Sequence, residues 1–112
     1  MLIAGKVWGH TEQLFANAAF EAHLITVIRD HRCSKHRHAT KYNAFRVMAG
    51  KLLVTVWQPT GTIDITTLNP GQTLVVPPGV FHQFTAPEAT VALEFYWTEL
   101  HANDIEREDT GE

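Results

Sequence analysis

Turn signals recur along the chain about every 8–12 residues, and this spacing restricts the fold more than any other feature. The turns combine glycine, proline and asparagine, which adopt or impose the backbone angles of tight turns. Short runs rich in β-branched and aromatic residues separate them. Such an alternation of short strands and turns predicts an all-β sandwich or barrel. The expected turns lie at residues 49–51, 58–61, 69–71, 77–79 and 86–87.

The runs between these turns predict five strands. In the last of them, alternate apolar side chains from Val91 to Trp97 share one face, while Glu94 and Tyr96 share the other. The strands are expected at residues 23–28, 51–57, 62–68, 74–76 and 91–100. Bulky apolar side chains are expected to fill the barrel core or line its cavity, namely Phe45, Val47, Phe81, Phe84, Phe95 and Trp97.

The chain is the size of one domain, which we expect to span residues 1–112. A hydrophobic content of 45% allows a real but small core, so apolar surface remains uncovered and a homodimer is expected. Helix is conceivable only at residues 12–19 and 103–108, and we expect the first stretch to be extended or irregular. The acidic tail from about residue 106 is expected to be frayed.

Charge and hydropathy exclude several classes of function. The formal net charge is -3 and no basic block occurs, which argues against nucleic acid as a partner. No run of about 18 apolar residues exists, so no membrane span is expected. Nothing at the start resembles a signal peptide, and we expect a cytoplasmic protein. The single cysteine, Cys33, rules out an internal disulfide.

Seven histidines in so short a chain point to chemistry. His36 and His38 are two residues apart, so on a strand both imidazoles leave the same face. His82 follows a Pro-Pro-Gly turn and opens the next strand. If the two strands are neighbours, three imidazoles converge, and these are the minimal ligand set for Zn, Fe, Mn, Co or Ni. The remaining histidines are expected to be structural or exposed, namely His10, His23, His31 and His101.

These two histidine segments resemble the two sequence motifs of the cupin family. The first motif is matched by His36, His38 and Gly50, and the second by Gly71, Pro77, Gly79 and His82. The resemblance implies a jelly-roll β-barrel in which the three histidines hold a divalent metal. The glycines are expected at turns that need positive φ or a close backbone approach.

Three positions depart from the cupin pattern. Asp30 stands at the first glycine, Ala86 at the final asparagine, and Asn43 at the glutamate ligand. An amide oxygen is a weaker ligand than a carboxylate. Asn43 is therefore expected either to bind the metal weakly or to form hydrogen bonds next to the ligands without touching the metal. With neutral ligands the metal keeps its full positive charge, which favours an anionic substrate. Glu94 can replace the missing carboxylate if it faces inward.

A looser resemblance covers most of the chain. Residues 7–9, Lys41 and residues 103–107 are similar to the isomerase domain of type II mannose-6-phosphate isomerase/mannose-1-phosphate guanylyltransferase. This resemblance implies that Lys41 and Arg107 contact a phosphate. Glu94 and Tyr96, on one face of the last strand, are further candidates for substrate contact.

Three functions remain open from the sequence. The first is a metal-dependent enzyme that isomerises a sugar phosphate or otherwise modifies a carbohydrate. The second is a three-histidine Fe(II) dioxygenase acting on a small organic acid or diketone. The third is a non-catalytic cupin that binds a small molecule. No nucleophile elbow or phosphate-binding glycine loop is present, so hydrolysis by a serine nucleophile and nucleotide binding are not expected.

Overall fold

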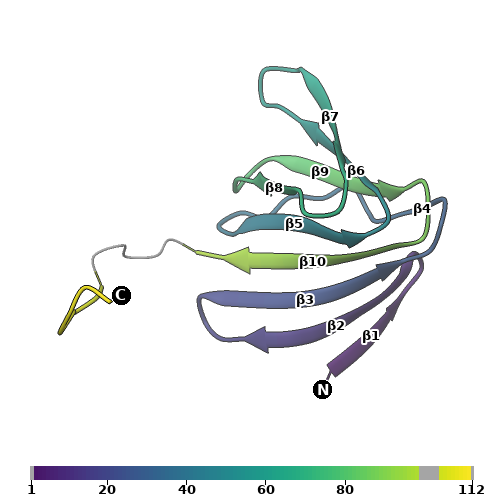
Figure 1. The fold of residues 1–112 in the computed structure, drawn as a ribbon. Helices are drawn as coiled ribbons and strands as arrows, with labels where there is room; N and C mark the ends of the chain where they lie inside the picture. Colours follow the sequence, from purple (N-terminus) through teal and green to yellow (C-terminus); the bar gives the residue numbers. More distant parts are fainter. Residues whose placement is uncertain (1, 99–103, 112) are drawn as a thin grey trace.

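Ten β-strands and no helix make up the regular structure of the described residues, 2–98 and 104–111, in this computed structural model (Figure 1). None of these residues belongs to a helix that is long and apolar enough to cross a membrane. The strands are β1 (Leu2–Lys6), β2 (Gly9–Ala16), β3 (Phe20–Val27), β4 (His31–Arg32), β5 (Tyr42–Ala49), β6 (Leu52–Trp57), β7 (Ile63–Leu68), β8 (Thr73–Val76), β9 (Phe81–Ala86) and β10 (Thr90–Trp97).

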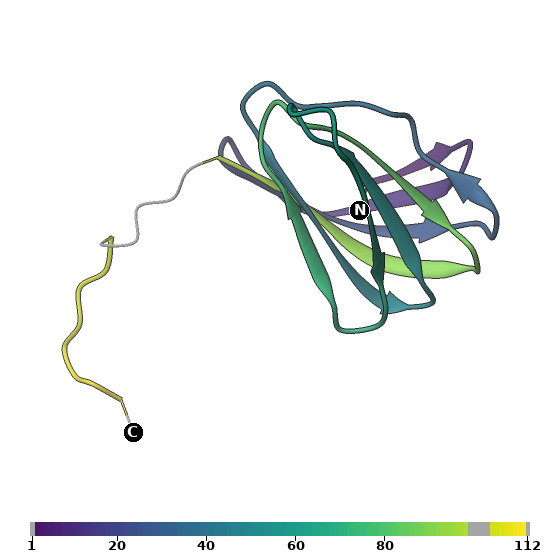
Figure 2. The ribbon, with the colours of Figure 1, turned by 90° about the horizontal axis from the view of Figure 1, so that it is seen from above.

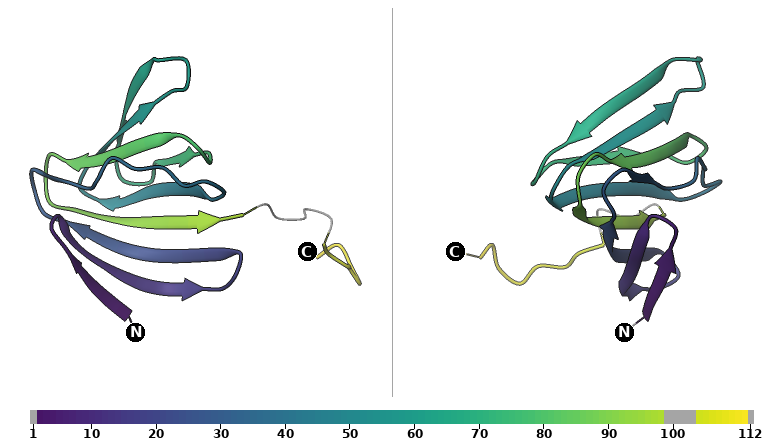
Figure 3. Two further views of the ribbon diagram at one scale, coloured as in Figure 1. Left: turned by 180° about the vertical axis from the view of Figure 1, so that it is seen from behind. Right: turned by 90° about the vertical axis from the view of Figure 1, so that its right-hand side faces the viewer.

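The strands form two antiparallel sheets. The larger has the order β1-β2-β3-β10-β5-β8, and the smaller has the order β4-β9-β6-β7. The β6–β7 hairpin lies at one end of the molecule and the β1–β2 hairpin at the other (Figures 1 and 3). Seen from above, strands of the two sheets overlie one another at an angle (Figure 2). This architecture confirms the all-β jelly roll expected from the sequence.

The core lies between the two sheets and follows the period-two alternation of the strands. On β5, Phe45 and Val47 are fully buried, and on β6, Leu52 and Val54 are fully buried. Each buried side chain of this size stabilises the fold by about 1.5–3 kcal/mol. Ile25 and Phe84 join the same apolar cluster from β3 and β9. The core therefore takes one face from each sheet.

Two aromatic side chains predicted for the core lie on the other side of the larger sheet. On β10 the buried residues are Thr90, Ala92 and Glu94, so the side chains of Phe95 and Trp97 point away from the core. Phe95 packs against Phe20, and Trp97 stacks on Tyr42. The prediction was wrong because alternation separates the two faces of a strand without saying which one is inside. Phe81 is also 37% exposed, outside the core.

Several element boundaries also differ from the sequence prediction. Residues 9–16 form a regular strand, β2, and the strands β1, β4 and β5 were not predicted. The predicted last strand ends at Trp97, and its residues 99 and 100 lie outside the described part of the chain. Residues 104–108 form no helix, while residue 103 and His101 also lie outside the described residues.

Positive backbone angles occur where the two motifs predicted glycine turns. The φ angles of Gly50, Gly71 and Gly79 are 91°, 85° and 80°. Asp30, at the position of the first motif glycine, has a φ of 64° and is the one non-glycine residue with positive φ in the described part of the chain. Aspartate tolerates this left-handed region better than most residues. The backbone thus keeps a turn that the family pattern assigns to glycine.

Replacing Gly50 with alanine is expected to destabilise the protein much more than replacing Gly71. A Cβ on Gly50 would lie 2.4 Å from the Ala89 carbonyl oxygen, whereas a Cβ on Gly71 would meet nothing within 4 Å. Both substitutions strain a positive φ, which costs about 1–2 kcal/mol. Only Gly50→Ala adds a backbone collision, so its total cost is expected to exceed about 3 kcal/mol. Urea unfolding followed by circular dichroism measures both, and equal losses would contradict this assignment.

Candidate metal centre

Backbone pairing brings the two histidine segments together. His36 and His38 lie between β4 and β5, and His82 lies on β9. The His36 N–H donates to the His82 carbonyl at 3.1 Å, and the His82 N–H donates to the His36 carbonyl at 2.9 Å. The Gly79 N–H donates to the His38 carbonyl at 2.7 Å. These bonds attach an irregular segment to the smaller sheet, although the sequence predicted that His36 and His38 would lie on a strand.

The three imidazoles converge as the spacing predicted. Nitrogen atoms of His36, His38 and His82 all lie within 4.8 Å of one another. Nitrogen ligands about 2.1 Å from one ion lie about 3.4 Å apart in tetrahedral geometry. Side-chain movements of about 1 Å are therefore needed to bring all three nitrogens onto a single ion.

Hydrogen bonds orient two of the rings so that Nε2 is left for a ligand role. His82 donates from Nδ1 to the Val80 carbonyl at 2.9 Å, and His36 donates from Nδ1 to the Ser34 carbonyl at 2.8 Å. Carbonyl partners of this kind commonly set the tautomer of metal-binding histidines. His38 Nε2 is buried and has no hydrogen-bond partner among the described residues. A buried nitrogen without a partner is costly, and a cation at this point would satisfy it.

Burial and the neighbouring His36 favour the neutral forms of His38 and His82. Burial, together with the nearby His36, Lys41 and His82, lowers the pKa of His38 to about 4. Burial also lowers the pKa of His82, against the opposing effect of its bond to Val80. A neutral imidazole keeps the lone pair that a metal requires. These two rings are therefore ready for a cation at neutral pH.

Asn43 occupies the place beside the cluster that the motif assigns to a carboxylate. It is completely buried, and its Oδ1 lies 2.9 Å from His82 Nε2. Its Nδ2 donates to the Phe95 carbonyl at 3.1 Å and to Glu94 Oε2 at 3.4 Å. A neutral His82 has one N–H and cannot donate to both Val80 and Asn43. A proton or a cation shared between Nε2 and Oδ1 would resolve this conflict.

The cluster opens into a cavity of about 780 Å³. Glu94 faces inward, as the sequence hypothesis required, and only 8% of it is exposed. Burial raises the pKa of its carboxyl, while Tyr96 and Asn43 act in the opposite direction by hydrogen bonding. Burial and then the Glu94 charge raise the pKa of Tyr96. Both groups hold their protons more firmly than they would in water and line one wall of the cavity.

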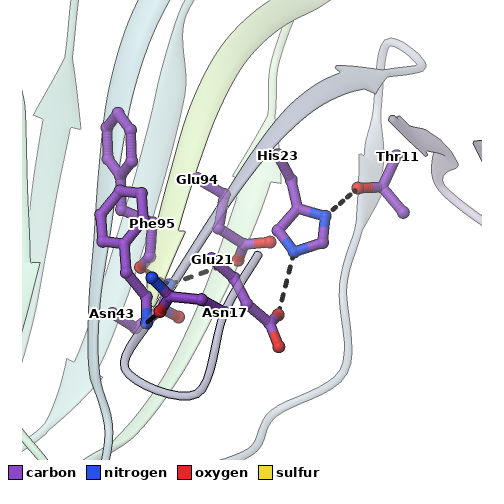
Figure 4. A network of polar contacts seen from close by, with 8 residues as sticks. Thr11, Asn17, Glu21, His23, Asn43, Glu94 and Phe95 are labelled. Atoms are coloured by element: carbon purple, nitrogen blue, oxygen red, sulfur yellow. Dashed lines mark hydrogen bonds and ion pairs between the residues drawn. The ribbon is translucent and has the colours of Figure 1, made fainter. Parts of the chain in front are cut away.

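The sequence prediction missed the position of His23, which lies on the cavity wall. His23 Nε2 lies 3.1 Å from Glu21 Oε2, and His23 Nδ1 lies 3.3 Å from Thr11 Oγ1 (Figure 4). His23 also pairs directly across the sheet with Glu94. The signal was present in the alternation of Glu21, His23 and Ile25, which places all three on the inner face.

Cations gather at the same cavity. Lys6, Arg32 and Lys41 all line it, and Lys41 Nζ lies 4.7 Å from the centre of the Tyr96 ring. Lys41, Glu94 and Tyr96 therefore line one cavity, and their contact with a substrate stays a prediction. Arg107 is exposed and does not line this cavity, so its contact with a substrate stays a prediction.

Comparison with known proteins decides the family. A family model described as a cupin domain matches residues 23–99, which include all three histidines. The chain belongs to the cupin family. No curated protein matches it by sequence.

Several solved cupin-like structures share its fold. KdgF from Halomonas sp. has a TM-score of 0.76 at 16% identity, with coverage of 89% of this chain and 88% of KdgF. The capsular polysaccharide assembling protein CapF from Staphylococcus aureus has a TM-score of 0.77 at 15% identity, covering 92% of this chain and 30% of CapF. A variant of oxalate decarboxylase from Bacillus subtilis has a TM-score of 0.78 at 14% identity, covering 87% of this chain and 27% of that protein. At these identities the likeness establishes the fold alone.

Cys33 lines the cavity but is a poor candidate for ligand or nucleophile. Only 6% of it is exposed, and its Sγ accepts a hydrogen bond from the Phe84 N–H at 3.2 Å. Burial, opposed by the bond from Phe84, raises its pKa to about 11. The thiolate is the form that binds metals and attacks electrophiles. The cysteine is therefore structural in the folded protein.

Cys33 is expected to resist alkylation until the protein unfolds. With a pKa of about 11, roughly one thiol in a thousand is ionised at about pH 8, compared with about one in four for an ordinary cysteine. Mass spectrometry after iodoacetamide treatment should show slow labelling in buffer and fast labelling in guanidinium chloride. Similar labelling rates under both conditions would show that the thiol is accessible and ionised.

Proposed function

We propose that His36, His38 and His82 hold a divalent metal and that the cavity above them binds an anionic carbohydrate. The observation that carries the proposal is the buried, unpartnered Nε2 of His38 beside two rings whose Nδ1 atoms are already bonded to carbonyls. Three imidazole donors suit Zn, Mn, Ni, Co or Fe. When bound, such an ion supplies a positive charge that polarises the oxygen of a sugar carbonyl or hydroxyl.

The residues of the cavity suit a sugar that carries a phosphate or carboxylate. Lys41, Arg32 and Lys6 provide charge-assisted hydrogen bonds for the anionic group. Glu94 and Tyr96 offer hydrogen-bonding groups for sugar hydroxyls on the same cavity wall as Lys41. A cavity of about 780 Å³ is in the range of small-molecule sites. We therefore place this protein among sugar-phosphate isomerase-like or carbohydrate-modifying cupins that act on small-molecule substrates.

A specific observation favours a second candidate. The clustered ligand atoms come from three histidines, with no carboxylate among them in the described residues. This is the donor set of the three-histidine Fe(II) dioxygenase considered from the sequence. The fold is also shared with an enzyme named for oxalate, a small organic acid. Oxygen uptake with small acids or diketones distinguishes this function from isomerisation.

Metal binding is expected to depend on the cluster and not on histidine content. Loss of a residue that hydrogen-bonds a metal ligand typically weakens metal affinity by about 10–100-fold. His38→Ala and His82→Ala each remove a ligand itself, so each should weaken the affinity by more than that. Asn43→Glu should tighten it by about tenfold, because a carboxylate adds a negative charge next to the ion. Isothermal titration with Zn²⁺ and Mn²⁺ measures each affinity.

His31→Ala is the matched control for this titration. His31 lies on β4, outside the cluster, and its Nδ1 bonds the Arg29 carbonyl, so its replacement should leave metal affinity unchanged. If His38→Ala binds metal as well as the unmodified protein, the proposed centre is wrong. If Asn43→Glu leaves the metal affinity unchanged, Asn43 does not contact the ion.

The carbohydrate proposal predicts a selective effect of Lys41→Ala. Loss of a charged hydrogen bond should raise KM for mannose 6-phosphate by about tenfold or more and leave KM for unphosphorylated mannose unchanged. Conversion to the ketose phosphate is followed by NMR in D₂O with metal-loaded protein. If the protein binds mannose 6-phosphate but converts none of it with any of the metals, it is a non-catalytic sugar-binding cupin. Absence of both binding and turnover would contradict the carbohydrate proposal.

A further inference from the structure

The outer face of the larger sheet is apolar where water would favour polar side chains. Residues paired directly across antiparallel strands point to the same face. On the outer face, β10 presents Leu93, Phe95 and Trp97, and β3 presents Phe20 and Leu24 opposite them. The inner face of β10 carries the polar Glu94 and Tyr96. In an antiparallel sheet with one wet face, the expected pattern is the reverse.

The apolar face continues onto the neighbouring strands. Phe15 on β2 is 54% exposed, and Val75 on β8 is 49% exposed. Tyr42 and Ala44 on β5 share this face with Trp97 and Phe95 through the β5–β10 register. Large exposed apolar patches are uncommon on monomeric proteins and often mark interaction sites. This face, made of the outward side chains of β2, β3, β10, β5 and β8, is called here the outer apolar face.

Two opposite charges flank the centre of the outer apolar face in one row. The register pairs Glu12 with Leu24, Leu24 with Leu93, and Leu93 with Arg46. The row therefore reads anion, leucine, leucine, cation across β2, β3, β10 and β5. Neither Glu12 nor Arg46 takes part in an ion pair among the described residues, and Arg46 donates to Thr73 Oγ1 at 3.0 Å.

We propose that the outer apolar face is covered by the same face of a second copy of this chain. A twofold axis that runs along the strands, midway between β3 and β10, reverses the row. It places Leu24 over Leu93 of the partner subunit and Glu12 over Arg46 of the partner subunit. A symmetric dimer needs a surface that is complementary to itself, and this order of charges meets that requirement. Each interface then contains two such ion pairs, one on either side of the axis.

The symmetric order of charges in this row indicates that a second copy of the chain covers the outer apolar face. A ligand or an unrelated partner would not require the anion and the cation to lie at equal distances on either side of the β3–β10 boundary. The cavity opens from the inner face of the same sheet, where Thr11, His23 and Glu94 point. Dimerisation through the outer apolar face therefore leaves both cavities open to ligands and does not need a bound metal.

Charge reversal tests the proposed register. Glu12→Arg or Arg46→Glu alone places like charges opposite each other, and each should raise the dimer dissociation constant by about tenfold or more. The double variant Glu12→Arg/Arg46→Glu restores opposite charges and should return the constant to within about threefold of the unmodified protein. Analytical ultracentrifugation of the full chain over a concentration series, with and without EDTA, gives each constant.

Ile65→Lys on β7 is the control, because Ile65 is 63% exposed on the other sheet and its replacement should not affect association. Far-UV circular dichroism establishes that every variant folds. A dimer that is weakened by each single reversal and restored by the double variant supports the proposal. A monomer at all concentrations overturns it. So does a dimer that is indifferent to the single reversals, or one that the double variant fails to restore.

Discussion

The two backbone hydrogen bonds between His36 and His82 are the contact on which the candidate site depends. They join a segment outside the regular strands to β9, which lies far away in the sequence. Without them the smaller sheet would keep its apolar core, but His36 would lose its backbone attachment to β9, and His38 would keep only its bond from Gly79. Because the bonds are between backbone groups, they hold the segment and leave all three imidazoles free to point at one another. The Ser34 and Val80 carbonyls then set the orientation of two rings.

Strand β10 connects this site to the rest of the molecule. It lies between β3 and β5 at the centre of the larger sheet, and its two faces serve different purposes. The inner face brings Glu94 and Tyr96 to the cavity, and Glu94 receives a hydrogen bond from Asn43. The outer face carries the row of apolar side chains proposed to meet a second copy. A single strand can do both because successive side chains point to opposite sides of the sheet.

Much of the fold and the main cluster could be predicted from sequence. The turn spacing predicted strands that correspond to β3, β6, β7, β8 and β10, and the paired motifs predicted that His36, His38 and His82 converge. The positive φ of Gly50 and Gly71 was also predictable, because local backbone requirements depend on a few neighbouring residues. The role of His23 was missed because its neighbours on the cavity wall, Glu94 and Tyr96, are distant in the chain and become adjacent only through the β3–β10 register.

The sequence by itself determined the class of fold, the positions of the tight turns and the residues able to bind a metal, since these depend on side-chain type and local spacing. Tertiary structure decided which face of each strand became the interior. It turned Phe95 and Trp97 outward and buried Glu94 and Asn43 beside the histidines. The physical reason is that period-two alternation is symmetric between the two faces of a strand. Only the packing of one sheet against the other breaks that symmetry.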